Sequence, residues 1–228
     1  MQEKSFLFFQ LFCYTILMII TYLGKQFFKI QQGDTVLAFN PIGKDSKVSS
    51  PSRFGADVAF TTTNYKDFNG VDMVSHGETV PFVVSGPGDY EVKDIFIKGL
   101  ISDSVIDGKK YINTIYSLSV DGINLCFLGA LSSENLPSET REAIDTADIV
   151  FVPVGGDGVL APAAAYKLAS SLEPKIIIPM DYGEDKEKNT LKTFLKEAGE
   201  EKVEAIEKLT IKKKDLEGKD AEVVVLSY

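Results

Sequence analysis

The chain has 228 residues with 33 acidic and 24 basic side chains, so its formal net charge at pH 7 is −9. Hydrophobic residues at 44% and charged residues at 25% are ordinary globular values, which argue against a disordered chain and against a multi-span membrane protein. Only two of the basic residues are arginines, Arg53 and Arg141. Because nucleic-acid binding needs clustered positive charge, we expect no nucleic-acid partner.

Two cysteines and one histidine limit the kinds of site that the chain can build. Cys13 and Cys126 lie in apolar segments without C-x-x-C spacing, which argues against a disulfide framework or a cysteine zinc site and favours the reducing cytoplasm. His76 lies in a Ser-His-Gly loop, where a solvated imidazole needs no functional reason. A zinc site built on several histidines is therefore excluded.

Residues 6–20 are almost continuously apolar. This run of about 15 residues is shorter than the ~20 that span a bilayer, and no small-residue cleavage site follows it. From Met18 the sequence is typical of a strand that enters a turn at Gly24. We therefore expect residues 1–17 to be a leader or a mis-assigned start, and residues 18–228 to form one domain. A membrane anchor over residues 1–17 is the alternative.

Short apolar runs separated by turn residues continue to about residue 130. They predict strands over 26–30, 34–39, 56–61, 80–85, 90–99, 111–120 and 123–128. Residues 31–34 and Asp121-Gly122 are typical of hairpin connections, and residues 86–89 of a tight turn. The first 130 residues therefore favour a mainly antiparallel sheet.

The second half predicts helices between buried strands. Ser138 is placed as the N-cap of a helix that ends near Thr146. Uninterrupted apolar runs over 148–153 and 175–179 flank a predicted helix over 161–172, which is typical of a βαβ crossover. Another helix is predicted over 187–198, with strands over 203–213 and 221–227. Residues 208–214 alternate lysines with apolar residues, as an exposed edge strand does. This order predicts an α/β fold, a four-layer sandwich of two mixed sheets with helices on the outer faces.

Several motifs occur together in one order along the chain: Thr21-Tyr22-Leu23-Gly24, Phe39-Asn40-Pro41, Gly86-Pro87-Gly88-Asp89-Tyr90-Glu91-Val92, Asn113-Thr114-Ile115-Tyr116, Phe127-Leu128-Gly129, Pro153-Val154-Gly155-Gly156 and Ile178-Pro179-Met180-Asp181-Tyr182. In this order they resemble the metallo-β-lactamase fold, most closely its lactonase-like branch, which includes ascorbate 6-phosphate lactonase and related zinc-dependent hydrolases. The resemblance covers residues 18–228. It implies a zinc- or manganese-dependent hydrolase fold.

Members of this family bind one or two metal ions through an H-x-H-x-D-H loop, a mid-chain histidine, a bridging aspartate and a late histidine. The resemblance assigns the loop histidines to Thr63, Tyr65 and Phe68, and only Asp67 matches the pattern. The mid-chain histidine falls on Ser102, beside Asp103, the bridging aspartate on Ala130 and the late histidine on Asp181. Lys25 follows Gly24 where the family has Gly-His.

The remaining ligand set is small. Asp67 and Asp181 alone would hold Mg²⁺ or Mn²⁺ weakly, with water completing the coordination. Alternatively, Lys25 and Lys66 would form a network with these carboxylates and replace the charge of the metal. Both lysines pointing to solvent is the equally weighted alternative. We therefore expect no resident metal or other cofactor.

Catalysis without a metal has little support, because the hydroxyls of Ser102, Thr63 and Tyr65 lack a histidine base. Gly155 and Gly156 lie in a strand-to-helix turn that, with Lys66, would suit an anionic ligand, although a plain tight turn explains it equally well. We expect a cytoplasmic protein that has lost metal-dependent hydrolysis and binds a small molecule or a protein in a scaffold or regulatory role, with self-association left open. The alternative is a hydrolase of a lactone, ester or phosphate-bearing small molecule.

Overall fold

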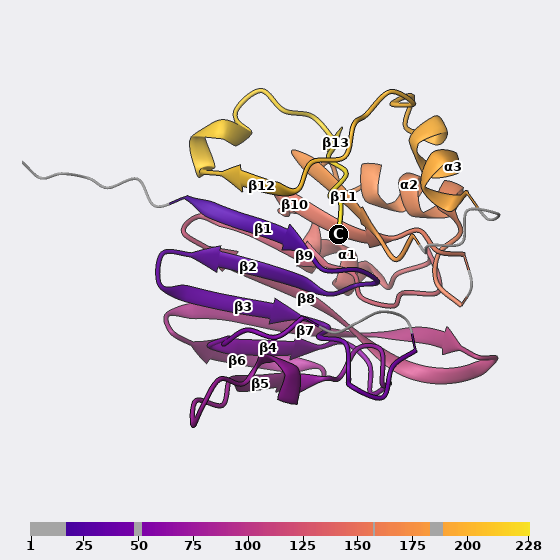
Figure 1. The fold of residues 1–228 in the computed structure, drawn as a ribbon. Helices are drawn as coiled ribbons and strands as arrows, with labels where there is room; N and C mark the ends of the chain where they lie inside the picture. The colour runs from indigo at the N-terminus through magenta and orange to yellow at the C-terminus, as the bar shows by residue number, and fades with distance from the viewer. Residues whose placement is uncertain (1–16, 48–51, 157, 183–188) are drawn as a thin grey trace, which may run out of the picture.

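The computed structural model describes residues 17–47, 52–156, 158–182 and 189–228. They form two β-sheets packed face to face (Figure 1). The six-stranded sheet has the order β12 (Lys208–Ile211), β1 (Met18–Tyr22), β2 (Phe28–Gln32), β3 (Thr35–Phe39), β4 (Val58–Thr61) and β5 (Phe82–Ser85). The seven-stranded sheet has the order β13 (Glu222–Val223), β11 (Ile176–Met180), β10 (Ile149–Pro153), β9 (Ile123–Phe127), β8 (Lys109–Val120), β7 (Ile95–Ile106) and β6 (Gly88–Val92).

An aromatic core lies between the two sheets. Phe39 and Phe60 stack with ring centroids 4.2 Å apart, and Phe127 of the opposite sheet packs 4.8 Å from Phe39. Along β1 the side chains alternate between buried and half-buried, because successive residues of a strand point to opposite faces. β10 and β11 are instead buried at every position and run parallel, as their uninterrupted apolar sequences predict.

Helices cover the outer face of the seven-stranded sheet. Leu168 of α2 (Pro162–Ser170) and Phe194 of α3 (Thr190–Glu197) pack in one cluster with Val150 and Ile177 of the sheet, and Ile144 of α1 (Ser138–Ile144) joins them. On the six-stranded sheet, the helical cover within the described residues is the 3₁₀-helix η1 (Val71–Val74). A second 3₁₀-helix, η2 (Lys213–Leu216), follows β12. The predicted α/β fold of two mixed sheets is confirmed.

Both sheets are mixed because each contains a parallel part. β3, β4 and β5 are parallel neighbours, and so are β9, β10, β11 and β13. The mainly antiparallel sheet expected for the first 130 residues therefore holds except at β3 to β5. Loops join these strands without the tight turn that an antiparallel hairpin needs.

Local boundaries differ from the sequence prediction at several places. Residues 90–99 are divided between β6 and β7 by a turn at Lys93 and Asp94, which have φ values of 50° and 58°. Two successive positive φ values are typical of a type I′ hairpin turn, but Lys-Asp is not a strong signal for one. Pro137, not Ser138, is the N-cap of α1. The predicted strands over 203–213 and 221–227 shorten to β12 and β13, and the predicted start of α3 falls outside the described residues.

Other predictions fall partly outside these ranges. The apolar leader, except for Leu17, and Cys13 lie outside the described residues. Cys126 is a free cysteine in β9, where burial raises the pKa of its thiol to about 12. None of the helices formed by the described residues is long and apolar enough to cross a membrane. β12 forms an edge of its sheet, as its lysine pattern predicts.

Asp57 ties β3 to β4. Its Oδ2 accepts a hydrogen bond from the Val36 N–H at 2.8 Å, and its Oδ1 forms an ion pair with Lys93. Burial by itself raises the pKa of the Asp57 carboxyl, but Lys93 and the Val36 N–H hold it below its ordinary value. The carboxylate therefore stabilises the fold above the unfolded pKa of about 4, and this stabilisation is lost as the pH falls through the lower folded pKa.

We expect Asp57→Ala to lower the free energy of unfolding at pH 7 by about 1 kcal/mol, because the Lys93 ion pair is largely exposed and the lost backbone hydrogen bond contributes modestly. Urea unfolding at pH 7 and at about pH 3 measures this difference. The difference in the free energy of unfolding between wild type and variant should be smaller at the lower pH. An equal gap at both values would show that the carboxylate charge is irrelevant.

Candidate functional site

The positions assigned to metal ligands come from both sheets, and all but Ser102 lie in the segments that follow strands. Lys25 lies in the turn between β1 and β2, the segment 63–68 follows β4, Ser102 belongs to β7, Ala130 follows β9 and Asp181 follows β11. They separate into three groups with different partners. The first is polar and charged, the second is centred on an asparagine, and the third is apolar.

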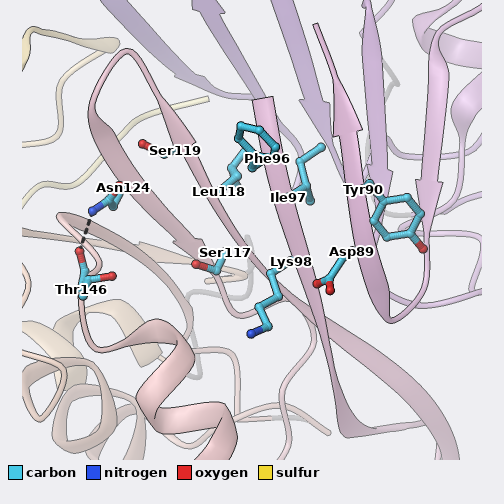
Figure 2. A pocket seen from close by; sticks show the side chains of 10 residues that line it. All are labelled: Asp89, Tyr90, Phe96, Ile97, Lys98, Ser117, Leu118, Ser119, Asn124 and Thr146. Carbon is cyan, nitrogen blue, oxygen red and sulfur yellow. Dashed lines mark hydrogen bonds between the residues drawn. The ribbon is translucent and has the colours of Figure 1, made fainter. Parts of the chain in front are cut away.

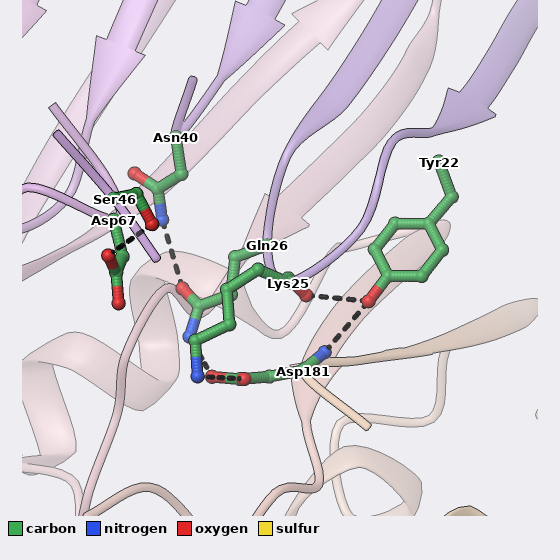
Figure 3. A network of polar contacts seen from close by, with 7 residues as sticks. All are labelled: Tyr22, Lys25, Gln26, Asn40, Ser46, Asp67 and Asp181. Atoms are coloured by element: carbon green, nitrogen blue, oxygen red, sulfur yellow. Dashed lines mark hydrogen bonds and ion pairs between the residues drawn. The ribbon is translucent and has the colours of Figure 1, made fainter. Parts of the chain in front are cut away.

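Lys25 and Asp181 form a close ion pair (Figure 3). Lys25 Nζ lies 2.7 Å from Asp181 Oδ1, and Gln26 Nε2 donates a hydrogen bond to Asp181 Oδ2 at 2.8 Å. The Asp181 side chain is 4% exposed. Both oxygens of this carboxylate thus have a cationic or amide partner from the β1–β2 turn, 155 residues away in sequence for Gln26.

Buried amides extend this group into the six-stranded sheet. Asn40 Nδ2 donates to Gln26 Oε1 at 2.9 Å, and Asn40 Oδ1 accepts the Thr62 N–H at 2.8 Å. Gln26 and Asn40 are completely buried. Since a buried polar group is costly unless it is hydrogen-bonded, each amide here depends on the next. We therefore expect the series of hydrogen bonds from Asp181 through Gln26 and Asn40 to Thr62 to form or break as one unit.

Three residues of this group have left-handed backbone conformations. The φ values are 56° for Lys25, 45° for Asn40 and 60° for Asp181. Such conformations cost of order 1–3 kcal/mol each in non-glycine residues and persist only where the surroundings impose them. Hydrogen bonds to the Lys25 carbonyl hold Lys25 and Asp181 in these conformations. The Asp181 N–H donates to this carbonyl at 2.6 Å, and the Tyr22 hydroxyl donates to it at 2.7 Å.

Tyr22 is held as a neutral donor beside this ion pair. Burial, the neighbouring Tyr182 and the Asp181 carboxylate raise the pKa of its hydroxyl well above the ordinary value. Its oxygen also accepts the Asp181 N–H at 3.3 Å. Tyr22 therefore fixes the backbone that carries both Lys25 and Asp181.

Asn113 of β8 joins three of the assigned positions. Its Nδ2 donates to Ser102 Oγ at 2.8 Å, and its Oδ1 accepts the Ala130 N–H at 2.9 Å and, at 3.4 Å, the Thr63 hydroxyl. Nδ2 also donates to the Leu128 carbonyl at 2.9 Å. Asn113 is completely buried. Its amide therefore forms hydrogen bonds within the chain to the polar groups of Thr63, Ser102 and Ala130.

The third group is apolar. Phe68, Ala130 and Val159 form a buried cluster against which Tyr65 and Ile106 pack. Ile106 lies at the tip of the long β7–β8 hairpin. Three of the residues in this cluster, Tyr65, Phe68 and Ala130, stand at positions that the family resemblance assigns to metal ligands. Packed aromatic and alanine side chains thus occupy the positions assigned to two loop histidines and to the bridging aspartate.

Two contacts hold the hairpin tip over this cluster. The Tyr65 hydroxyl donates to Asp107 Oδ2 at 2.7 Å, and this bond to Asp107 raises the pKa of Tyr65 to about 12. Gly158 approaches so closely that a Cβ built on it would lie 1.8 Å from the Val105 carbonyl oxygen. The close approach requires glycine at that position.

Asp67 and Lys66 do not join the Lys25–Asp181 pair. Asp67 is buried and its Oδ1 accepts the Ser46 hydroxyl at 2.6 Å, as Figure 3 shows beside the other network. The Lys66 ammonium lies 5.9 Å from the Tyr65 ring centroid and forms no ion pair with a described carboxylate. The lysine network expected from the sequence is therefore formed by Lys25 and Asp181, without Lys66 or Asp67.

The donors present do not fit a zinc or manganese site. Within the described ranges no three histidine, cysteine, aspartate or glutamate side chains come together. Zinc takes three or four such ligands, and the remaining candidates are one carboxylate paired with an ammonium and one that accepts a hydroxyl. His76, exposed in a short bridge with Thr79, is not part of the group.

The predicted glycine turn is only partly open. A Cβ on Gly155 would lie 2.6 Å from the Asp181 carbonyl oxygen, so this glycine is needed for packing against the ion-pair turn. Gly156 has a φ of 77° and open space around it, and Asp157 lies outside the described residues. The close approach of Gly155 gives the tight-turn interpretation a structural reason.

One depression borders the second group, and another lies apart from all three groups. A groove of about 760 Å³ is lined by residues 61–64, 85–87, 110–112 and 114, six of which carry a hydroxyl, and Thr63 is one of them. Figure 2 shows a smaller pocket of about 390 Å³ along β6, β7 and β8, where Phe96 and Lys98 stand among polar side chains. None of the assigned ligand positions lines the smaller pocket.

Sequence reasoning missed the amides that organise the site. Asn40 and Asn113 lie in two of the motifs that carry the family resemblance, so a signal was present, but it did not indicate their partners. Gln26 gives no signal, because its bonds depend on the approach of β11 to the β1–β2 turn.

Residues 19–181 match the family model described as the β-lactamase superfamily domain. The chain belongs to this family. The match spans most of the chain and ends at Asp181, so the β-lactamase-superfamily segment includes every assigned ligand position. No curated protein sequence matches the chain significantly.

Solved structures agree with the family assignment. This β-lactamase-superfamily protein is similar to a candidate zinc-dependent hydrolase of the metallo-β-lactamase superfamily from Thermotoga maritima, with 26% identity, a TM-score of 0.70 and coverage of 92% of this chain and 98% of that one. A candidate metal-dependent hydrolase from Parabacteroides distasonis is 17% identical, with a TM-score of 0.62 and coverage of 92% and 94%. A metallohydrolase from Ignicoccus hospitalis is 17% identical, with a TM-score of 0.58 and coverage of 86% and 99%.

Proposed function

We propose that this protein is a β-lactamase-superfamily member without metal-dependent hydrolase activity, and that residues 18–228 act as one cytoplasmic domain with a binding, scaffold or regulatory role. The observation that carries the proposal is the ion pair of Lys25 with Asp181. An ammonium within 2.7 Å of a carboxylate supplies the positive charge that a metal ion would otherwise supply. Gln26 engages the other carboxylate oxygen.

The chemistry of metal-assisted hydrolysis supports the same conclusion. A catalytic metal needs several protein ligands and an open position for the water that it activates. Here the apolar cluster of Phe68, Ala130 and Val159 fills space among the assigned ligand positions, and Asn113 engages Thr63 and Ser102. Neither group provides a base that would activate a water or a hydroxyl.

The second candidate function is hydrolysis of a lactone, an ester or a phosphate-bearing small molecule by a carboxylate-bound Mg²⁺ or Mn²⁺. It is favoured by the similarity to proteins described as metal-dependent hydrolases and by the retained Asp67. Asp67 and Asp181 have separate partners, so this function would require both to exchange those partners for a metal.

Elemental analysis of the purified chain, with hydrolysis assays on a lactone and a phosphodiester in added Zn²⁺, Mn²⁺ or Mg²⁺, tests the proposal. We expect far less than one metal ion per chain and no turnover above buffer, because two separated carboxylates bind divalent ions weakly. Asp67→Ala and the exposed control Asp72→Ala should behave alike. Stoichiometric metal with turnover that Asp67→Ala abolishes and Asp72→Ala preserves would establish the hydrolase instead.

A further inference from the structure

The four edges of the two sheets differ in how they are protected against pairing with another strand. β12 carries Lys208 and is followed by lysines, β13 is two residues long, and β6 carries Asp89 and Glu91. Charges and short length are the usual means by which proteins prevent edge-to-edge association. β5 (Phe82–Ser85) has no charged residue, and neither has the segment 79–88 around it.

Apolar side chains are exposed along this uncharged segment. Val80 is 71% exposed, Phe82 49% and Val83 39%, whereas Val84 points into the core and is fully buried. β5 is the terminal strand of the six-stranded sheet, and Figure 1 places it at the lower margin of the molecule. An exposed, uncharged edge strand offers both backbone groups and apolar surface to a partner strand.

The backbone of β5 shows which groups are free to pair. The Phe82 N–H donates to the Asp57 carbonyl on the β4 side at 2.8 Å. Because successive residues of a strand direct their backbone groups to alternate sides, Val83 and Ser85 direct theirs away from β4. Pro81 is buried and has no N–H, so it contributes no donor at this edge.

We propose that β5 is a self-association strand, and that two copies of this chain pair antiparallel through it about a twofold axis at Val83. In this register Val83 of each copy exchanges both backbone hydrogen bonds with Val83 of the other. Pro81 lies opposite Ser85 in this register, is buried and has no N–H, so the Val83 pair supplies the backbone hydrogen bonds between the copies.

A second copy fits this edge better than a charged partner strand does. Twofold pairing places the same patch on both sides, so an uncharged strand meets an uncharged strand and Phe82 lies opposite Val84. With the axis at Val83, Glu78 lies opposite Gly88 and not opposite another acid. The contact is short, and a dissociation constant of order micromolar or weaker is expected because the buried area is below that of standard interfaces.

Charge gives the association a recognisable salt dependence. Each copy carries a net charge of −9, so two copies repel one another except at the uncharged segment. Added salt screens this repulsion and leaves the backbone and apolar contacts intact. The dimer therefore tightens as the ionic strength rises, whereas an interface made of ion pairs would weaken.

Sedimentation velocity of the full chain over roughly 5–500 µM, at about 20 mM and about 500 mM salt, tests the proposal. We expect a monomer–dimer equilibrium that shifts toward dimer at high salt. Hydrogen exchange should show concentration-dependent protection of residues 82–86. Val83→Lys adds a protecting charge to the edge, and Val83→Pro removes an N–H that β4 does not use, so both should abolish the dimer.

Phe96→Lys is the matched control, because Phe96 is 68% exposed but stands on β7, inside a sheet (Figure 2). It should leave the dimer unchanged, and unchanged thermal unfolding of Val83→Lys shows that the monomer remains folded. A wild type that is monomeric throughout, or a dimer broken by Phe96→Lys and not by Val83→Lys, overturns the proposal. Loss of the dimer has no bearing on metal content or turnover, so the proposed function is tested separately.

Discussion

Replacing Lys25 by methionine is expected to lower the free energy of unfolding by about 2 kcal/mol, which is less than for a fully buried pair because Lys25 is 28% exposed. Methionine keeps the aliphatic stem and a Cβ at this left-handed position, so the backbone strain is unchanged. What is lost is the ammonium 2.7 Å from Asp181 Oδ1. The carboxylate, 4% exposed, then retains Gln26 as its side-chain donor.

Urea unfolding of Lys25→Met, Asp181→Asn and the double variant measures the coupling between the two residues. Asp181→Asn should cost less than Lys25→Met. Lys25→Met leaves a buried carboxylate without its cation, whereas Asp181→Asn leaves a neutral amide buried and an ammonium that is 28% exposed to water. The double variant should cost less than the sum of the single ones. Additive costs would show that the ion pair is not a coupled unit.

Lys93→Met is the matched control for this prediction. It makes the same substitution in the ion pair with Asp57, where Lys93 is 47% and Asp57 25% exposed. The expected loss is below about 1 kcal/mol, because water replaces an exposed cation at little cost. Equal losses for the two lysines would contradict the idea that Lys25 compensates a buried charge.

Asn113→Ala is expected to be the most destabilising substitution among the site residues, at about 4 kcal/mol. The variant leaves the buried Ala130 N–H and Leu128 carbonyl without their amide partner, whereas the half-buried Ser102 hydroxyl keeps its bond to the backbone carbonyl of residue 113. Each unsatisfied buried group costs about 1–3 kcal/mol. The substitution also creates a cavity beside Gly129.

Thermal and urea unfolding of Asn113→Ala against Asn124→Ala checks this prediction. Asn124 Nδ2 donates one exposed hydrogen bond to the Thr146 carbonyl at 3.0 Å, so its loss should cost under about 1 kcal/mol. Water entering the space left by Asn113 would reduce the difference between the variants. A difference below about 1 kcal/mol would mean that Asn113 does not hold this region together.

The sequence predicted the buried parallel strands well and the edges of elements less well. β10 and β11 have five consecutive apolar residues each, which is a pattern that burial on both faces imposes. The turn at Lys93 and Asp94 escaped prediction, because neither residue is a strong turn former and the hairpin geometry comes from the pairing of β6 with β7. The N-cap of α1 is Pro137, one residue before the predicted Ser138.

The candidate site shows a comparable division. That Lys25 and Asp181 would pair was a hypothesis from the resemblance, and the structure places them 2.7 Å apart. Lys66, a possible member of the same network, forms no ion pair with a described carboxylate, and its ammonium lies 5.9 Å from the Tyr65 ring centroid. Sequence position assigns a residue to a loop, whereas the direction of a long side chain depends on what packs around it.

By itself the sequence determined the composition of the site: one histidine in the whole chain, and lysine, threonine, tyrosine, phenylalanine, serine, alanine and aspartate at the positions that the resemblance assigns to the metal site. Only the tertiary structure decided what these residues do together. Asp181 is paired with a lysine from the β1–β2 turn, Asn113 forms hydrogen bonds to three separate segments of the chain, and Phe68 packs under the β7–β8 hairpin. These contacts join residues far apart in the chain, and long-range packing is information that no local pattern contains.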